Sequence, residues 1–202
     1  MRGTASFIDR PRAGKCFLPA MSEAPPAPEE PSDPESTWTV ADGVIRCAGL
    51  PAGCLRTHAT YRDYVLRFEW RWTGAPGNSG CFVHLTEPDK VWPQCLEIQL
   101  RATDAGSVRM NGGASVNEVR PPAPNARQVT RRTADTEKPP GEWNQAEVVC
   151  RGDSVTVTIN GVLQTEVTGS TLADGAIALQ SEGAPTEFRA IEMAPLPAMD
   201  GR

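Results

Sequence analysis

Strict alternation of apolar and polar residues is the feature that most constrains the fold of this chain. Residues 96–100 read Leu-Glu-Ile-Gln-Leu, and residues 64–72 read Tyr-Val-Leu-Arg-Phe-Glu-Trp-Arg-Trp. Successive side chains of a β-strand point to opposite faces, so each segment predicts a strand with one apolar and one polar face. Together they indicate antiparallel sheet that packs on one side. The other side is either a binding surface or an ordinary solvated face.

Turn signals divide most of the chain into short strands of the same kind. Asp42-Gly43 and Asn160-Gly161 each separate two apolar runs, a pattern typical of tight hairpins. Paired prolines and glycines between about residues 102 and 140 break the pattern and predict a long irregular excursion. The expected strands are 37–40, 44–47, 55–57, 64–72, 81–85, 95–101, 145–150, 155–159, 162–167, 175–180 and 187–193. Many short strands with regular turn signals predict an all-β sandwich or jelly roll.

The beginning of the chain has a different composition. Prolines alternate with glutamate and aspartate up to residue 36, and such a mixture buries too little apolar area to offset the entropy of ordering. We therefore predict a disordered, acidic, proline-rich tail over residues 1–36 and one β-sandwich domain over residues 37–202. The full chain of 202 residues with 5 Trp is long enough for one sizeable core.

Charge and hydropathy exclude several classes of partner. The formal net charge of −5 gives no reason to expect binding to nucleic acid or to acidic membranes. No apolar run approaches the roughly 20 residues that span a bilayer. The apolar patch of the N-terminal segment, residues 16–18, is far shorter than the core of a signal peptide. We expect a cytoplasmic protein as the sequence is written, or a periplasmic or secreted one if the start is mis-set. The sequence sets no oligomeric state.

The cysteines do not form a metal-binding pattern. The 6 Cys show no C-x-x-C spacing and the chain has only 2 His, which excludes a zinc ribbon or finger. Several cysteines lie among apolar residues of predicted strands, where a free thiol packs as a small hydrophobic group. In the absence of an export signal we expect mostly reduced, buried thiols. Cys47 and Cys54 are the first pair to examine for a bridge.

A series of landmarks follows in chain order from about residue 38 to residue 196. It runs through Tyr61-Arg62-Asp63-Tyr64, Glu69-Trp70-Arg71, Gly77-Asn78-Ser79-Gly80, Leu96-Glu97-Ile98-Gln99, Gly141-Glu142-Trp143-Asn144, Asn160-Gly161, Leu179-Gln180 and Phe188-Arg189. This series resembles the 3-keto-disaccharide hydrolase family, which implies a concanavalin A-like sandwich. The chain departs from the family pattern at two positions. Glu182 stands where members often carry His, and His84 stands where they often carry Arg.

The resemblance implies a hydrolase acting on glycosides that are oxidised at C3 of the sugar. A ketone at C3 acidifies the proton on C2, which a general base removes, and the resulting enolate expels the glycosidic oxygen from C1 before water adds back. Cationic or hydrogen-bonding groups, or a divalent metal ion, would stabilise the enolate oxygen. The identity of such a metal ion is left open. The two departures leave a non-catalytic carbohydrate-binding module of the same fold as the alternative.

Two residues are the catalytic candidates. Glu97 is the candidate base or metal ligand, and its neighbour on the same face is the amide Gln99. A retaining glycosidase needs a second carboxyl group about 5–5.5 Å away, which an amide cannot supply, so elimination with a single base fits this strand better. His84 is the second candidate because imidazole titrates near neutral pH. The alternatives are a structural surface carboxylate and a histidine satisfied by its surroundings.

Six further residues are predicted to bind the substrate. We expect Glu69 and Arg71 to approach Glu97 across the sheet, although a cross-strand ion pair is the plain alternative. Arginine suits a sugar hydroxyl or an enolate oxygen, and an exposed tryptophan suits stacking on a sugar face. The predicted substrate-binding residues are Glu69, Arg71, Gln99, Trp92, Gln180 and Arg189.

Overall fold

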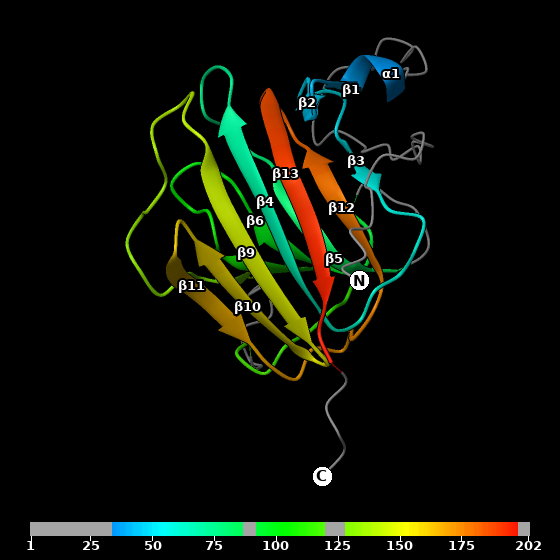
Figure 1. The fold of residues 1–202 in the computed structure, drawn as a ribbon. Coiled ribbons are helices and arrows are strands. Elements are labelled where there is room, and N and C mark those ends of the chain that lie inside the picture. The colour runs from blue at the N-terminus through cyan, green and yellow to red at the C-terminus, as the bar shows by residue number, and fades with distance from the viewer. Residues whose placement is uncertain (1–33, 87–91, 120–127, 198–202) are drawn as a thin grey trace, which may run out of the picture.

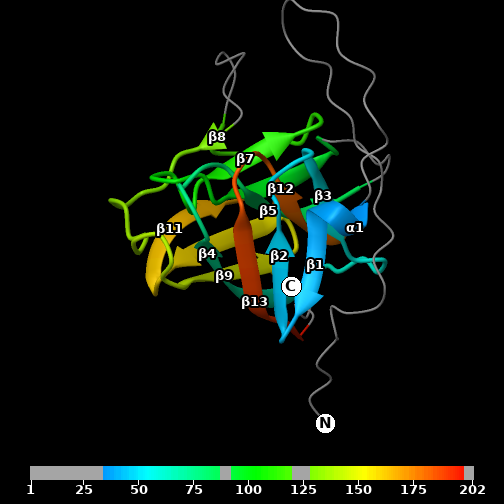
Figure 2. The ribbon, with the colours of Figure 1, turned by 90° about the horizontal axis from the view of Figure 1, so that it is seen from above.

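Two antiparallel β-sheets stacked face to face form the protein. We describe a computed structural model over residues 34–86, 92–119 and 128–197. One short helix, α1 (Pro34–Thr37), precedes the first strand, and every other element is a strand. Figures 1 and 2 show the two layers from the side and from above. The prediction of an all-β, concanavalin A-like sandwich is confirmed. Of the predicted tail, residues 1–33 lie outside the described residues.

The larger sheet has seven strands in the order β1-β2-β13-β4-β9-β10-β11. Their bounds are β1 Trp38–Ala41, β2 Val44–Cys47, β13 Thr186–Pro195, β4 Tyr64–Trp72, β9 Asn144–Arg151, β10 Ser154–Ile159 and β11 Val162–Val167. Both predicted hairpins form here, joining β1 to β2 and β10 to β11. Asp42, Gly43, Asn160 and Gly161 all adopt the positive φ that a tight hairpin turn of this kind requires.

The smaller sheet has six strands in the order β3-β12-β5-β6-β7-β8. Their bounds are β3 Gly53–Arg56, β12 Ala176–Ser181, β5 Gly80–Leu85, β6 Cys95–Gln99, β7 Val108–Asn111 and β8 Gln128–Val129. β7 and β8 lie inside the stretch predicted to be irregular, so that prediction is wrong for these residues. The two strands are very short and lie between glycine- and proline-rich segments, so neither shows a long alternating run in the sequence.

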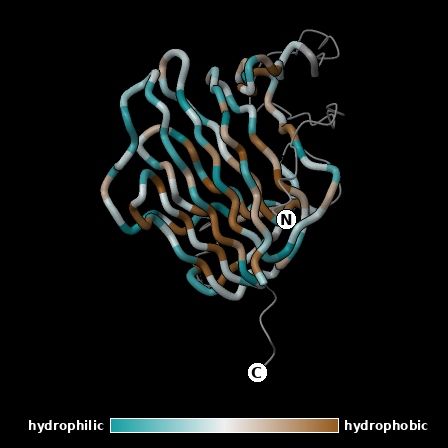
Figure 3. The backbone as a smooth tube through the Cα atoms, in the orientation of Figure 1, coloured by the Kyte–Doolittle hydropathy of each residue, from teal (hydrophilic) through white to brown (hydrophobic). Residues whose placement is uncertain are grey.

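The core lies between the sheets and follows the alternation read from the sequence. From the larger sheet, Leu66, Phe68 and Trp70 of β4 point inward, and from the smaller sheet Leu96 and Ile98 of β6 meet the same cluster. All five are at most 1% exposed, and full burial of such a side chain stabilises the fold by roughly 1.5–3 kcal/mol. Apolar segments accordingly run along the middle of the strands (Figure 3).

The cysteines are unbridged in the part of the chain that the structure describes. Cys47, Cys81, Cys95 and Cys150 are buried free thiols, and Cys54 is a partly buried one. The bridge considered between Cys47 and Cys54 is not formed. Separately, none of the helices among the described residues is long and apolar enough to cross a membrane.

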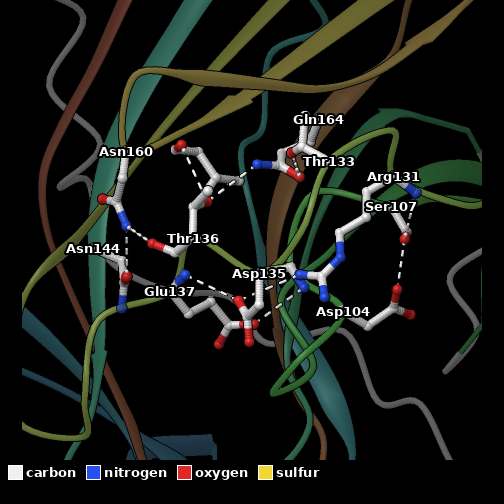
Figure 4. Close-up of polar contacts among 12 residues, drawn as sticks. Asp104, Ser107, Arg131, Thr133, Asp135, Thr136, Glu137, Asn144, Asn160 and Gln164 are labelled. Atoms are coloured by element: carbon white, nitrogen blue, oxygen red, sulfur yellow. Dashed lines mark hydrogen bonds and ion pairs between the residues drawn. The ribbon is translucent and has the colours of Figure 1, made fainter.

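Asn160 ties the β10–β11 hairpin to the segment that leads into β9. Its Nδ2 donates to the Thr136 carbonyl (2.8 Å) and to Asn144 Oδ1 (2.9 Å), and its Oδ1 accepts from the Gln145 amide (2.8 Å). Figure 4 shows Asn160 beside Asn144 and Thr136, with Gln164 bonded to the same segment. The Asn160 side chain therefore holds the β10–β11 turn against the segment that leads into β9.

We predict that Asn160→Ala lowers the free energy of unfolding by about 4 kcal/mol. The variant loses the three hydrogen bonds, each contributing about 1 kcal/mol, and places alanine at positive φ at a further cost of about 1 kcal/mol. Asn160→Gly loses the same bonds but tolerates the turn, so we expect a smaller loss. Urea unfolding of both variants checks this, and two variants as stable as the wild type would contradict it.

Candidate functional site

One face of the smaller sheet gathers polar side chains on neighbouring strands. Because Leu96 and Ile98 point into the core, Glu97 and Gln99 stand on the opposite face of β6. Arg109 of β7 lies directly across from Glu97 in the strand register. On β12 the core-facing neighbour is Leu179, which leaves Gln180 on the same outer side. We call this surface, defined by Glu97, Gln99, Arg109, Asn111 and Gln180, the Glu97 face.

Hydrogen bonds hold the Glu97 carboxylate in place. Asn111 Nδ2 donates to Glu97 Oε2 at 2.6 Å, and Gln99 Nε2 lies 3.4 Å from Glu97 Oε1. The side-chain oxygen Oε1 of Gln99 in turn accepts from the backbone amides of Leu100 and Arg101 at 3.1 and 3.0 Å, which fixes the orientation of the side-chain amide. Glu97 is only 1% exposed. The result is a buried carboxylate with its hydrogen-bond donors already in position, as a reacting group requires.

A second carboxylate, Glu182, follows directly after β12. Its backbone bridges to Asn78 in the loop before β5. Burial, and then the charge of Glu97, raise the pKa of Glu182 to about 7, while Asn78, Arg109 and Gln180 oppose the rise. Burial also raises the pKa of Glu97, against the opposing effects of Asn111, Arg109 and Gln180. Because the charge of Glu97 contributes to the raised pKa of Glu182, the protonation states of the two carboxyl groups are linked.

The raised pKa of Glu182 has a consequence for stability. A carboxyl whose folded pKa is above its unfolded value stabilises the fold fully below about pH 4.5, and this contribution is lost as the pH rises through about 7. We therefore expect Glu182→Gln to be more stable than the wild type at pH 8 by about 1–2 kcal/mol, after allowance for solvent screening. At pH 4 the two proteins should unfold at nearly the same urea concentration. An equal difference at both pH values would contradict this prediction.

The site residues do not fit a dedicated metal centre. Two carboxylates, Glu97 and Glu182, share the site with amide groups, and Asn111 already occupies one oxygen of Glu97. Within residues 34–86, 92–119 and 128–197, no three His, Cys, Asp or Glu side chains gather into a group able to hold a cation. Among the described residues, Arg109 is the positive group whose charge lowers the pKa of both carboxylates.

Three predicted residues lie on the other sheet. Glu69 and Arg71 of β4 and Arg189 of β13 face outward from the larger sheet, because Phe68, Trp70 and Phe188 beside them point into the core. The expectation that Glu69 and Arg71 approach Glu97 is therefore wrong. Instead Arg189 pairs with Glu69 at 2.6 Å, and Arg71 pairs with Glu187 at 2.7 Å. The Arg71 and Arg189 guanidiniums lie 4.5 and 3.9 Å from the ring centre of Trp143.

His84 is also kept apart from Glu97. It adopts φ 52° on β5, where the pairing with β12 shifts register, and the irregularity turns its ring toward the interior. The ring meets the edge of Tyr64 at 6.0 Å between centroids, and Nδ1 lies 3.2 Å from the Leu172 carbonyl. Burial lowers the pKa of His84, so the imidazole stays neutral at pH 7. The structure does not bring His84 to the Glu97 face.

The remaining predicted residues lie on or next to the Glu97 face. Gln99 and Gln180 are part of it. Trp92 is partly buried and packs against an apolar cluster that contains Phe82 and Cys95. Phe82 is the register partner of Glu97, so this cluster continues the same face along β5 and β6. Trp92 therefore borders the site from its apolar end.

Arg109, Asn111, Asn78 and Glu182 were absent from the set predicted from the sequence. A usable signal was present in the alternation Val108-Arg109-Met110-Asn111, which repeats the pattern of 96–100. Gln180 and Glu182 show the same two-residue spacing. Glu182 was read only as a departure from a family pattern, whereas the structure places it beside Glu97.

Comparison with known proteins agrees with this architecture. The family model described as the 3-keto-alpha-glucoside-1,2-lyase-like domain matches residues 27–194. A candidate glycosyl hydrolase from Parabacteroides distasonis ATCC 8503 is 19% identical, with a TM-score of 0.62 over 82% of this chain and 93% of that chain. The carbohydrate-binding module CBM66 from Bacillus subtilis is 12% identical, with a TM-score of 0.56 over 78% of this chain and 91% of that chain.

A third similar structure is the exoplasmic/lumenal domain of VIP36, solved with Ca²⁺ and Man3GlcNAc. It is 11% identical, with a TM-score of 0.57 over 82% of this chain and 85% of that chain. At these identities the likenesses establish the sandwich fold alone. A search of curated proteins finds no match to this chain.

Proposed function

Because the chain belongs to the 3-keto-alpha-glucoside-1,2-lyase-like family, we propose that the Glu97 face binds a glycoside oxidised at C3 and cleaves its glycosidic bond by elimination. The observation that carries the proposal is the pairing of Glu97 with Glu182. Elimination needs a base and an acid at neutral pH. Glu97, whose carboxylate accepts a hydrogen bond from Asn111, is placed to be the base, and Glu182, with a pKa of about 7, is placed to be the acid.

Glu97 is assigned the role of base. Asn111 donates to its carboxylate and Arg109 lies opposite on the next strand, and both favour the ionised form. The ionised carboxylate takes the proton from C2, and the electron pair of the C–H bond forms the enolate of the C3 ketone. Arg109 is the cationic group placed to stabilise the negative charge on the enolate oxygen.

Glu182 is assigned the role of acid. Its pKa of about 7 leaves much of it protonated at neutral pH. As the enolate reforms the ketone, the electron pair moves into a C1–C2 double bond and the C1–O bond breaks, and Glu182 protonates the leaving oxygen. For hydration, the Glu182 carboxylate takes a proton from water while the hydroxide adds to C1. Glu97 returns its proton to C2, so both carboxyl groups recover their starting states.

A non-catalytic sugar-binding role is the second candidate. It is favoured by the presence of Glu182 where members of the family often carry His, and by the fold shared with CBM66 and with the sugar-bound domain of VIP36. In this role the Glu97 face would hold a saccharide through the same side chains without turning it over.

Release of an aglycone from a 3-keto-α-glucoside tests the proposal. We expect the purified protein to release the aglycone and to leave the same glucoside with an unoxidised C3 hydroxyl intact, because only the ketone acidifies C2. Saturable binding of the keto-glucoside without release would favour the binding module. The absence of both binding and release would contradict both candidates.

A further inference from the structure

Buried polar atoms without partners lie on and next to the Glu97 face. Gln180 is 1% exposed, and its amide is close enough to Glu97 and Glu182 to lower the pKa of both, yet neither atom of the amide makes a hydrogen bond of good geometry to the described residues. Asn78 Oδ1 and Glu182 Oε2 lack partners in the same way. Leaving a buried polar group unpaired costs roughly 1–3 kcal/mol, so four such atoms in one place point to a ligand that supplies the missing bonds.

Gly80 provides room between two of the residues involved. A Cβ at position 80 would lie 2.8 Å from Gln180 Oε1 and 3.2 Å from both Cγ and Oε1 of Glu97. Gly80 does not have positive φ, so the backbone conformation at this position does not require glycine. The missing side chain instead allows the Gln180 amide and the Glu97 carboxylate to approach each other across β5.

The unpaired atoms define the chemistry of the ligand. Three of them can accept, namely Gln180 Oε1, Asn78 Oδ1 and the ionised Glu182 Oε2, and one is a donor, Gln180 Nε2. When Glu182 is protonated, its carboxyl can instead donate to a hydroxyl oxygen. Hydroxyl groups can donate to the three acceptors and accept from the amide. A carboxylate or a phosphate dianion has no proton to donate, and its charge would lie close to Glu97 and Glu182. The set therefore matches neighbouring hydroxyls of a neutral sugar.

We propose that Gly80, Gln180, Asn78 and Glu182 form a hydroxyl-binding subsite that selects neutral sugars over uronic acids and sugar phosphates. The absence of a side chain at position 80 allows the Gln180 amide to keep its place beside Glu97 in this subsite. The inference rests on the proposed function for the location of the substrate, but it requires only binding and no turnover.

The test compares the binding of methyl α-glucoside and methyl α-glucuronoside by ligand-observed NMR or calorimetry. We expect the neutral glucoside to bind at least about tenfold more tightly. Gly80→Ala should weaken binding of the glucoside at least about tenfold, because the new Cβ displaces the Gln180 amide. The displaced atom is the end of a flexible side chain, so the variant should remain folded. Gly53→Ala is the matched control, since a Cβ at this strand glycine meets nothing within 4 Å.

Gln180→Leu provides an independent check, because it removes the amide and keeps the approximate volume, and it should weaken binding as Gly80→Ala does. Equal binding of the glucoside and the glucuronoside, or unchanged binding by both variants, would overturn the subsite. The outcome is separable from that of the proposed function. Neutral sugar bound through this subsite without cleavage of a keto-glucoside would support the subsite and reject the lyase. Cleavage of the keto-glucoside that neither variant affects would support the lyase and reject the subsite.

Discussion

Glu97→Gln is expected to lower kcat for release of the aglycone from a 3-keto-α-glucoside by about 10²–10⁴-fold. The amide keeps the shape of the side chain and can still accept the hydrogen bond that Asn111 donates to Glu97 at 2.6 Å. It cannot remove a proton from C2. Since the substrate contacts remain, KM should change much less than kcat, which marks the loss of an interaction made in the transition state.

Glu142→Gln is a suitable control for this experiment. Glu142 is an exposed glutamate in the loop before β9, a strand of the larger sheet, whereas the Glu97 face belongs to the smaller sheet. We expect it to retain wild-type kcat and KM. A Glu97→Gln protein that is folded and releases aglycone at half the wild-type rate or more would show that Glu97 is not the base.

Glu182→Gln is expected to remove the alkaline limb of the pH–rate profile. In the wild type the active form carries an ionised Glu97 and a protonated Glu182, so the rate should fall as the pH rises through about 7, where Glu182 loses its proton. The variant should show no such limb and a kcat about 10²-fold lower. The measurement is kcat between pH 5 and 9 for both proteins.

The dependence on the leaving group distinguishes an acid from a residue that only maintains structure. With an acidic phenol as the aglycone, departure needs little protonation, so Glu182→Gln should lose much less activity than it loses with an alkyl aglycone. A variant that is equally impaired with both leaving groups, or that keeps the alkaline limb of the wild type, would assign the proton transfer to another group.

Alternation predicted the direction of side chains but not the sheet to which each strand belongs. Glu97 and Glu69 both stand opposite apolar neighbours that point into the core, as expected. Sequence periodicity carries no information on which strands pair, and β4 and β6 turned out to lie in different layers. For this reason Glu69, Arg71 and Arg189 were grouped with Glu97, whereas they form ion pairs and stack on Trp143 on the opposite side of the molecule.

The position of His84 shows a second limit of sequence reasoning. An unbroken strand would place it on the same face as Phe82, but its positive φ and the register shift beside it turn the ring into the core. Such an irregularity has no clear signature in the sequence. Glu182 shows a third limit, because comparison with a pattern in which another residue type is common concealed its candidate role. That role is indicated only by the backbone bridge to Asn78 and by the effect of the Glu97 charge on the Glu182 pKa.

The most direct test of the central claim is a crystal structure of the protein with a bound neutral glucoside. The account predicts sugar on the Glu97 face of the smaller sheet, with hydroxyls bonded to the Gln180 amide and its C1–C2 edge toward Glu97 and Glu182. Sugar stacked instead on Trp143 between Arg71 and Arg189, on the outer face of the larger sheet, would contradict it.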